Sequence, residues 1–303
     1  MQETRAKTGA TAREEAVFIE APGGAPSEPS RPGGATLAGR LFLPAGAPVA
    51  AVVLHGAAGV PRDYYAAFAE WLARERGAAA LIYAYRGCEA RQSRSALRRS
   101  QVGMVDWALH DQGAALAFMA ARFPGAELRV IGHSMGGFGT MLHGRADAVA
   151  RLTAVCSGPA LWTRARGAAR AQAFGFWHGL GQAALMFHGY IPGKLFGLGA
   201  DLPPNVYRDW RRWCTGPDLH KGDWGGALPM PADPPFSGRL TLVSAADDDT
   251  IPTAVVEDMA RFYPGASGVE TRVMDPAALG LESVGHIGGF SRRAAAAWPM
   301  IAD

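Results

Sequence analysis

Short apolar runs of strand length alternate along this chain with longer segments in which apolar residues recur at helical spacing. This alternation is typical of βαβ units, and it predicts an α/β fold with a mostly parallel sheet covered by helices on both faces. The predicted strands are 15–21, 36–43, 49–55, 78–84, 127–132, 151–156 and 239–244, and the predicted helices are 62–76, 104–122, 135–146 and 253–263.

The alternation stops between about Leu161 and Phe236. This stretch has no buried strand, and it contains five of the eight tryptophans. We therefore predict a helical lid inserted into a single core. The predicted boundaries are 15–159 and 237–303 for the core, 160–236 for the lid and 1–14 for a flexible N-terminus.

Aromatic and other large apolar residues gather in the first half of the predicted lid. Phe174, Trp177, Met186 and Phe187 are our candidates for an apolar substrate pocket. The alternative is that these side chains only bury the lid against the core. The eight Lys and Arg residues of the lid exceed its five Asp residues by three, which equals the net charge of the whole chain.

The segment Gly132-His133-Ser134-Met135-Gly136 carries the strongest chemical signal. It has the pattern G-x-S-x-G, and it lies between a predicted strand and a predicted helix. Glycines two residues before and after a serine leave room for a sharp turn that exposes its hydroxyl, as in the nucleophile elbow of an α/β-hydrolase. Ser134 is therefore the predicted nucleophile. We expect His133 to point away from the Ser134 hydroxyl, as a packing or positioning residue beside the pocket.

A serine nucleophile needs a base and an acid that orients the base, in the chain order Ser, Asp, His for this fold. Asp247, Asp248 and Asp249 follow the strand 239–244. We choose Asp248 because it stands four residues before Pro252, the usual offset of the acid in hydrolases of this kind. The alternative is that the acidic run only caps the helix 253–263.

Of the eight histidines, His286 alone follows the predicted acid in the chain, and it lies in a glycine-flanked loop. It is therefore the predicted base. His178 and His188 lie in an apolar stretch, where buried structural histidines are the usual case. No pair of histidines has convincing metal-ligand spacing, so no metal site is predicted.

Hydrolysis by a serine also needs backbone N–H groups that stabilise the oxyanion. The apolar strand 49–55 leads into a loop of small residues at the position that supplies one such donor. We assign the N–H groups of Ala57 and Met135 to this role. The alternative is a loop of small residues that only allows tight packing before the helix 62–76.

From about Val49 to Arg293 the chain resembles a bacterial family of predicted serine α/β-hydrolases, related to serine aminopeptidase-like and monoglyceride lipase-like enzymes. The motifs are Ala58-Gly59-Val60-Pro61 with Tyr64-Tyr65, Tyr83-Ala84-Tyr85-Arg86-Gly87, the elbow with Gly137, Gly189-Tyr190-Ile191-Pro192-Gly193-Lys194, Asp201-Leu202-Pro203 with Trp210, Trp213 and Cys214, and Gly280-Leu281 with Gly285-His286. Ala84 and Glu89 stand where the family usually has aspartate and glycine. The resemblance implies the fold and a hydrolase, with no particular substrate.

Composition narrows the class further. The chain of 303 residues has no signal-peptide core and no apolar run of membrane-spanning length, so we expect a cytoplasmic protein without membrane insertion. Its three cysteines are far apart, which argues against disulfides. Arginines 86, 91, 94, 98 and 99 form a basic cluster that we interpret as a solvated surface, because no nucleic-acid motif accompanies it.

These features predict a serine hydrolase that cleaves a small carboxylic ester, with an apolar acyl or alcohol group, through an acyl-enzyme and without a cofactor. Acyl transfer to another nucleophile would use the same residues. A noncatalytic binding protein on a hydrolase scaffold is the alternative from another class. The sequence leaves the oligomeric state open, with a homodimer among the possibilities.

Overall fold

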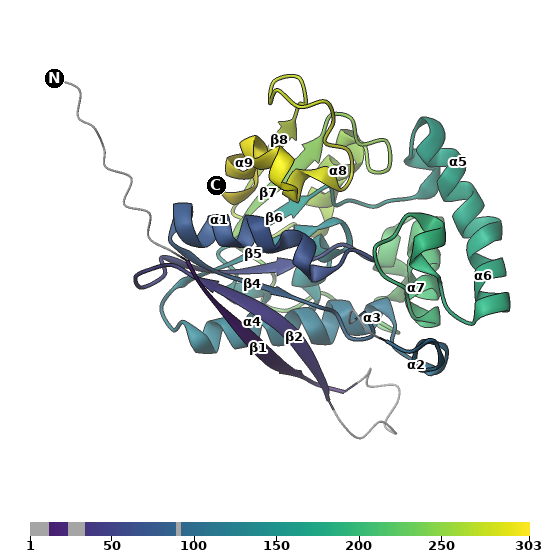
Figure 1. Ribbon diagram of the computed structural model, residues 1–303, viewed down its shortest axis with the longest axis horizontal. Coiled ribbons are helices and arrows are strands. Elements are labelled where there is room, and N and C mark those ends of the chain that lie inside the picture. Colours follow the sequence, from purple (N-terminus) through teal and green to yellow (C-terminus); the bar gives the residue numbers. More distant parts are fainter. Residues whose placement is uncertain (1–11, 24–33, 89–91) are drawn as a thin grey trace.

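The computed structural model describes residues 12–23, 34–88 and 92–303 (Figure 1). Most of the predicted flexible N-terminus, as well as Glu89 and Arg91, lies outside the described residues. Residues 13 and 14 belong to the first strand, so the predicted boundary at 14 is wrong by two residues. The strands are β1 (Arg13–Ala21), β2 (Ala35–Leu43), β3 (Ala50–His55), β4 (Ala78–Tyr83), β5 (Glu127–His133), β6 (Arg151–Val155), β7 (Arg239–Ala245) and β8 (Gly268–Met274).

These strands form one eight-stranded sheet in the order β1-β2-β4-β3-β5-β6-β7-β8. The first two strands are antiparallel to their neighbours, and the pairs from β4 to β8 are parallel. All six residues of β3 and of β4 are buried, as expected for strands covered on both faces. Parallel strands end at the same edge, so the loops after β3, β5 and β7 meet there. The fold is that of the α/β-hydrolases, as predicted.

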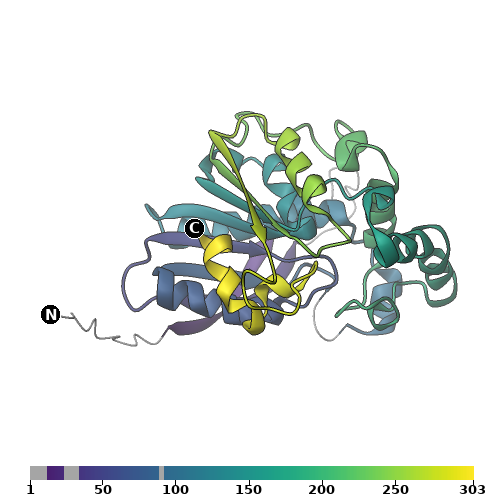
Figure 2. The ribbon, with the colours of Figure 1, turned by 90° about the horizontal axis from the view of Figure 1, so that it is seen from above.

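Helices cover both faces of the sheet (Figures 1 and 2). On one face, α1 (Ala66–Arg76) and α9 (Trp298–Ala302) bury apolar side chains in a common cluster. On the other face, α4 (Gln112–Arg122) and α8 (Thr253–Glu257) contribute to a second and larger cluster. Two short helices, α2 (Arg94–Arg99) and α3 (Met104–Asp106), precede α4.

The predicted helix 135–146 is wrong in detail. Instead of one α-helix, the structure has three short 3-10 turns, Ser134–Gly137, Gly139–Leu142 and Ala146–Ala148. Glycine is a poor helix former, and this segment begins with several glycines. Close packing around these glycines also excludes larger residues: a Cβ at Gly139 would lie 2.1 Å from Gln112 Oε1. The helix predicted over 104–122 is interrupted by a π turn at Trp107–Asp111.

The strand β8 was missed from the sequence. Six of its seven residues are exposed or only partly buried, because it lies at the edge of the sheet. An edge strand with polar side chains lacks the continuous apolar run by which the other strands were predicted.

Residues 160–236, here called the helical insertion, connect β6 to β7. The insertion consists of α5 (Gly167–Gly175), a π turn (Phe176–Leu180), α6 (Gly181–His188), α7 (Pro204–Thr215) and short 3-10 turns. Figures 1 and 2 both place it at one end of the molecule. It is attached to α2 and α3: Arg98 Nε donates to the His188 carbonyl (2.7 Å), and Asp209 accepts from the Met104 N–H (2.9 Å). Within the described ranges, no helix is long and apolar enough to cross a membrane.

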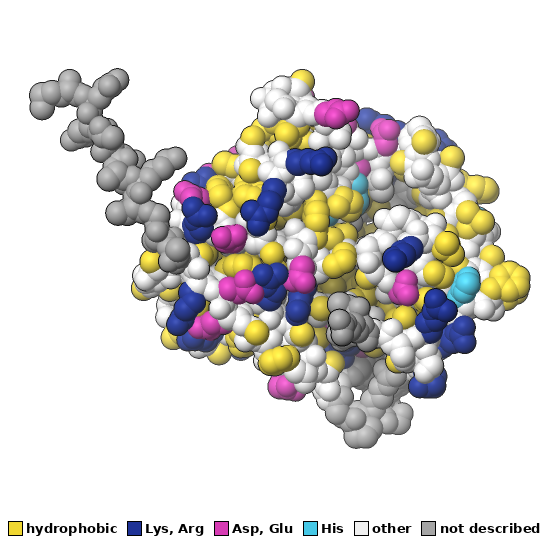
Figure 3. All heavy atoms as spheres, viewed as in Figure 1, with side chains coloured by type: hydrophobic (Ala, Val, Ile, Leu, Met, Phe, Trp, Pro, Cys, Tyr) yellow, Lys and Arg dark blue, Asp and Glu magenta, His cyan; other side chains and the backbone are white. Residues whose placement is uncertain are grey.

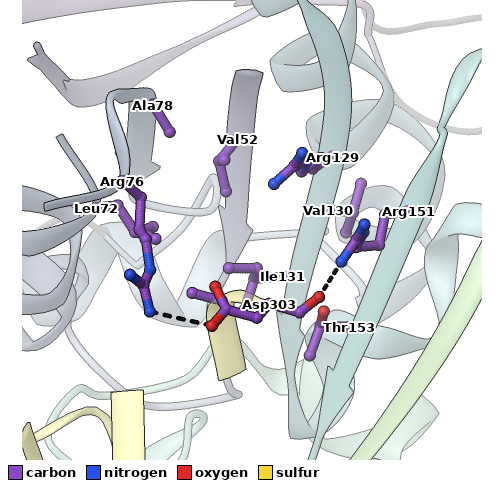
Figure 4. Close-up of a pocket in the computed structure, with 11 residues that line it drawn as sticks. Val52, Leu72, Arg76, Ala78, Arg129, Val130, Ile131, Arg151, Thr153 and Asp303 are labelled. Carbon is purple, nitrogen blue, oxygen red and sulfur yellow. Dashed lines mark hydrogen bonds and ion pairs between the residues drawn. The ribbon is translucent and has the colours of Figure 1, made fainter. Parts of the chain in front are cut away.

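A cavity of about 80 Å³ lies between the start of β4, β3, β5 and β6 (Figure 4). Three arginines line it, and Asp303 reaches into it. The Asp303 carboxylate accepts from Arg76 Nη2 (3.0 Å), and its main-chain oxygen accepts from Arg151. Because Ala78 and Arg151 are the first residues of β4 and β6, this cavity is on the edge of the sheet opposite to the loops that follow β3 and β5. The two contacts of Asp303 hold the chain end after α9 against α1 and β6, and the cavity takes no part in the predicted chemistry.

Candidate active site

Ser134 stands at the sharp turn that follows β5. Its φ of 52° lies in the left-handed region, which costs energy for any residue other than glycine. The flanking glycines make this turn possible: a Cβ at Gly136 would lie 2.0 Å from the His55 carbonyl oxygen, and one at Gly132 would lie 2.5 Å from the Gly136 carbonyl oxygen. The G-x-S-x-G spacing thus has the steric basis inferred from the sequence.

The structure brings Ser134, His286 and Asp248 together from three loops. His286 Nε2 lies 3.1 Å from Ser134 Oγ, and His286 Nδ1 lies 2.8 Å from Asp248 Oδ2. The Asp248 carboxylate is buried, and its Oδ1 accepts from the N–H groups of Thr250 (2.8 Å) and Ile251 (3.0 Å). A carboxylate held in this way keeps the proton of the neutral His286 ring on Nδ1, so that Nε2 faces the serine as an acceptor.

The neighbouring aspartates have other positions. Asp247 accepts from the main-chain N–H groups of Val284 and Gly285, each at 2.9 Å, and so holds the loop that carries His286. Asp249 is exposed. The alternative that the acidic run caps the following helix is wrong, because α8 has Pro252 at its N-cap position and no side-chain cap. The structure therefore places Asp248, and neither neighbour, against His286.

The two predicted oxyanion donors differ in the structure. The N–H of Met135 begins the 3-10 turn after Ser134, and no acceptor for it is found among the described residues. The N–H of Ala57, however, donates to the buried Tyr65 hydroxyl (2.8 Å), so in this structure it is not free for a substrate. The next N–H of the loop, that of Ala58, has no acceptor within the described part of the chain.

Both ring nitrogens of His133 have hydrogen-bond partners beneath the elbow. It is 1% exposed, its Nδ1 lies 2.8 Å from Tyr65 Oη, and its Nε2 lies 2.9 Å from the main-chain oxygen of His286. Burial lowers the pKa of His133 to about 3, so the ring is neutral near pH 7. Its burial and its partners exclude it from the walls of a pocket and agree with the expectation that it points away from the serine.

Cys156 was expected inside a strand but lies directly after β6 with a φ of 46°. Its thiol lies beside Asp248, and burial raises its pKa, so it stays protonated. Sγ of Cys156 and ligand atoms of Asp248 and His286 all lie within 4.8 Å of one another, which makes these three residues a possible metal-ligand set. Asp248 and His286 are already joined by a hydrogen bond to each other, so this arrangement serves the serine instead of a metal.

The predicted apolar pocket is largely wrong. Met186 and Phe187 are 73% and 74% exposed, so they form no closed wall, and Phe174 is half exposed against Trp162 and His178. Trp177 is buried within the helical insertion, 5.7 Å from the ring of Tyr207. Met186 and Phe187 face outward from α6, whereas Ala184 of the same helix is buried.

His178 and His188, expected to be buried, are exposed.

Figure 3 shows a recess between the core and the helical insertion, and it shows apolar side chains beside basic ones at the outer edge of the insertion.

Three functional neighbours were missed by the sequence reasoning: Tyr65, Asp247 in its role as an anchor, and Cys156 as a neighbour of the acid. Tyr65 belongs to one of the motifs of the resemblance, and that was its only signal in the sequence. The partners of these side chains are distant in the chain, which is why spacing could not reveal them.

Comparisons with known proteins agree with this fold. The family model described as serine aminopeptidase, S33, matches residues 46–188. A search of curated proteins finds no match. A thermophilic esterase from Thermogutta terrifontis is similar in structure, with a TM-score of 0.53, 16% identity and coverage of 94% of this chain and 96% of that one. Est1E from Butyrivibrio proteoclasticus has a TM-score of 0.51, 14% identity and coverage of 95% and 96%. At such identities these two likenesses establish the fold.

The sheet, the elbow at Ser134 and the family match lead to one class of protein. The chain is a serine α/β-hydrolase.

Proposed function

We propose that this hydrolase cleaves small carboxylic esters through a covalent acyl-enzyme on Ser134. The observation that carries the proposal is the continuous series of hydrogen bonds from Ser134 Oγ through His286 to the buried Asp248. A serine hydroxyl is a poor nucleophile at neutral pH, and this arrangement supplies the base and the orienting acid that activate it.

In the first step, Ser134 Oγ attacks the ester carbonyl while its proton passes to His286 Nε2. The negative oxygen of the tetrahedral intermediate takes hydrogen bonds from the Met135 N–H and from an N–H of the loop after β3. Because the Ala57 N–H already donates to Tyr65, the Ala58 N–H, which has no acceptor among the described residues, is our candidate for the second donor. His286 then protonates the alcohol as the bond to the acyl carbon breaks.

In the second step, water attacks the acyl carbon and gives its proton to His286. His286 returns this proton to Ser134 Oγ as the bond between Oγ and the acyl carbon breaks and the carboxylic acid leaves. Asp248 stabilises the imidazolium in both steps, and no cofactor takes part. We further propose that the helical insertion acts as a lid over this reaction, because it begins after the carboxyl end of β6 and its Arg166 N–H donates to the main-chain oxygen of Asp249 (2.8 Å), next to the acid.

An aminopeptidase would need a free carboxylate for the amine of its substrate. The insertion has no glutamate, and four of its five aspartates are already bonded: Asp201 to the Gly193 N–H, Asp209 and Asp223 to Arg212, and Asp218 to Arg261. These pairings favour an ester over a peptide with a free amine. Acyl transfer to an alcohol or amine uses the same residues, and product analysis in the presence of such an acceptor distinguishes it from hydrolysis.

The test combines a fluorophosphonate probe with a series of p-nitrophenyl esters. The wild-type protein should be labelled at Ser134 and should release p-nitrophenol, and Ser134→Ala should lose labelling and at least about 10⁴-fold in kcat. Ser157→Ala is a matched control, because Ser157 is buried after β6 and its hydroxyl donates only to the Ser134 carbonyl. This variant should remain labelled. A wild-type protein that is neither labelled nor active would indicate a noncatalytic binding protein.

A further inference from the structure

A buried series of hydrogen bonds joins the loop after β3 to the loop that carries His286. It runs from the Ala57 N–H to the Tyr65 hydroxyl (2.8 Å), from there to His133 Nδ1 (2.8 Å), and from His133 Nε2 to the His286 main-chain oxygen (2.9 Å). Tyr65 and His133 are 2% and 1% exposed, so water does not compete for these groups. Resting on the proposed function, we propose that Tyr65 and His133 are positioning residues that set the place of His286 relative to Ser134 and to the oxyanion loop.

The direction of each hydrogen bond follows from the two ends. A main-chain oxygen only accepts, so His133 Nε2 must carry the proton that points to His286. The neutral ring then has an acceptor at Nδ1, which takes the proton of the Tyr65 hydroxyl. The oxygen of Tyr65 in turn accepts from the Ala57 N–H. Every buried donor in the series has an acceptor, and the loss of any member leaves an uncompensated polar group.

The loop of His286 has few other anchors on this side. Gly285 has a φ of 57°, and glycines also follow at 288 and 289, so the backbone itself restrains the loop little. Asp247 holds Val284 and Gly285 from the side of the acid, and the Tyr64 hydroxyl donates to the Ile287 carbonyl (2.5 Å). Among the residues that the structure describes, the bond from His133 is the one hydrogen bond to the main chain of His286 itself. Since His133 precedes Ser134, it links the base directly to the elbow of the nucleophile.

The chain contains a natural control. Tyr83, at the end of β4, forms the same kind of buried pair with His55: its hydroxyl lies 2.8 Å from His55 Nδ1, and both residues are under 5% exposed. In this second pair the series ends, because His55 Nε2 has no partner among the described residues. Tyr65→Phe and Tyr83→Phe therefore remove the same atom from two buried Tyr–His pairs. The Tyr83 hydroxyl also bonds to Tyr85, whose hydroxyl donates to the Gly56 carbonyl (3.2 Å), so both changes lie next to the loop after β3. Only the first change breaks a series that continues to His286.

The experiment compares these two variants by thermal unfolding, by kcat and KM for p-nitrophenyl butyrate, and by the rate of fluorophosphonate labelling. We expect both to lower the melting temperature by a similar amount. Tyr65→Phe should reduce kcat and the labelling rate about 10- to 100-fold with KM within about 3-fold of wild type, since a small misplacement of catalytic groups has effects of this size. Tyr83→Phe should keep both rates within about 3-fold of wild type.

Two variants of His133 separate positioning from packing. His133→Gln can still donate an amide N–H to the His286 oxygen and should retain at least about 10-fold more activity than His133→Leu, which cannot. Equal kcat values for folded Tyr65→Phe and Tyr83→Phe, or for His133→Gln and His133→Leu, would overturn the proposal. A wild-type protein that fluorophosphonate does not label would instead refute the proposed function, so the two failures are distinguishable.

Discussion

The three consecutive aspartates after β7 allow a sharp test of the site, because the same change has three different expected results. In Asp248→Asn, the remaining oxygen can keep the bonds to the N–H groups of Thr250 and Ile251, and the new NH₂ group faces His286 Nδ1. Nδ1 must then act as an acceptor, so the proton of the ring moves to Nε2. That proton points at Ser134 Oγ, and the ring can no longer take the proton of the serine.

The expected loss for Asp248→Asn is about 10⁴-fold in kcat, the size of the effect in the serine protease with the equivalent change. This corresponds to about 5.4 kcal/mol of transition-state stabilisation. Asp247→Asn removes one of two acceptors that hold Val284 and Gly285, and we expect a loss of about 10-fold together with reduced stability. Asp249→Asn alters an exposed side chain and should change the free energy of unfolding by less than about 0.5 kcal/mol.

The assay is the steady-state hydrolysis of p-nitrophenyl butyrate by the three variants at pH 7.5, with urea unfolding as the measure of stability. Losses of equal size at all three positions would show that the acidic run acts only through overall charge or folding. A kcat above about one tenth of wild type for folded Asp248→Asn would refute the reasoning about the proton on His286.

Two further predictions follow from burial. His143 is buried and its pKa is lowered to about 4, so between pH 6.5 and 4 the unfolded chain binds a proton that the folded protein does not, and stability falls with decreasing pH. Urea unfolding at pH 8 and pH 5 should show a decrease that is smaller by about 2 kcal/mol in His143→Leu, and an unchanged decrease would mean that His143 is protonated in the folded protein. Met186→Ala and Phe187→Ala should leave the preference for ester chain length unchanged, because both side chains project into solvent, and a flattened preference in kcat/KM would place them in the pocket after all.

Much of the fold was predictable because its signals are local. Continuous apolar runs indicated the strands that are covered on both faces, whereas the exposed edge strand β8 gave no such run and was missed. The α-helix expected after Ser134 was wrong for another reason. The segment of small residues was compatible with a helix, but its glycines at 136, 137 and 139 are poor helix formers, and the backbone follows short 3-10 turns.

The sequence by itself determined the place of the nucleophile, because G-x-S-x-G expresses a steric requirement of the turn around Ser134. It also named His286, since no other histidine follows the predicted acid. The offset to Pro252 favoured Asp248 among three adjacent aspartates, and only the tertiary structure shows that this one faces the histidine and that Ala57 bonds to Tyr65. The tertiary structure also turned Met186 and Phe187 toward solvent. Those outcomes depend on packing between residues far apart in the chain, and no local pattern encodes the direction in which such side chains point.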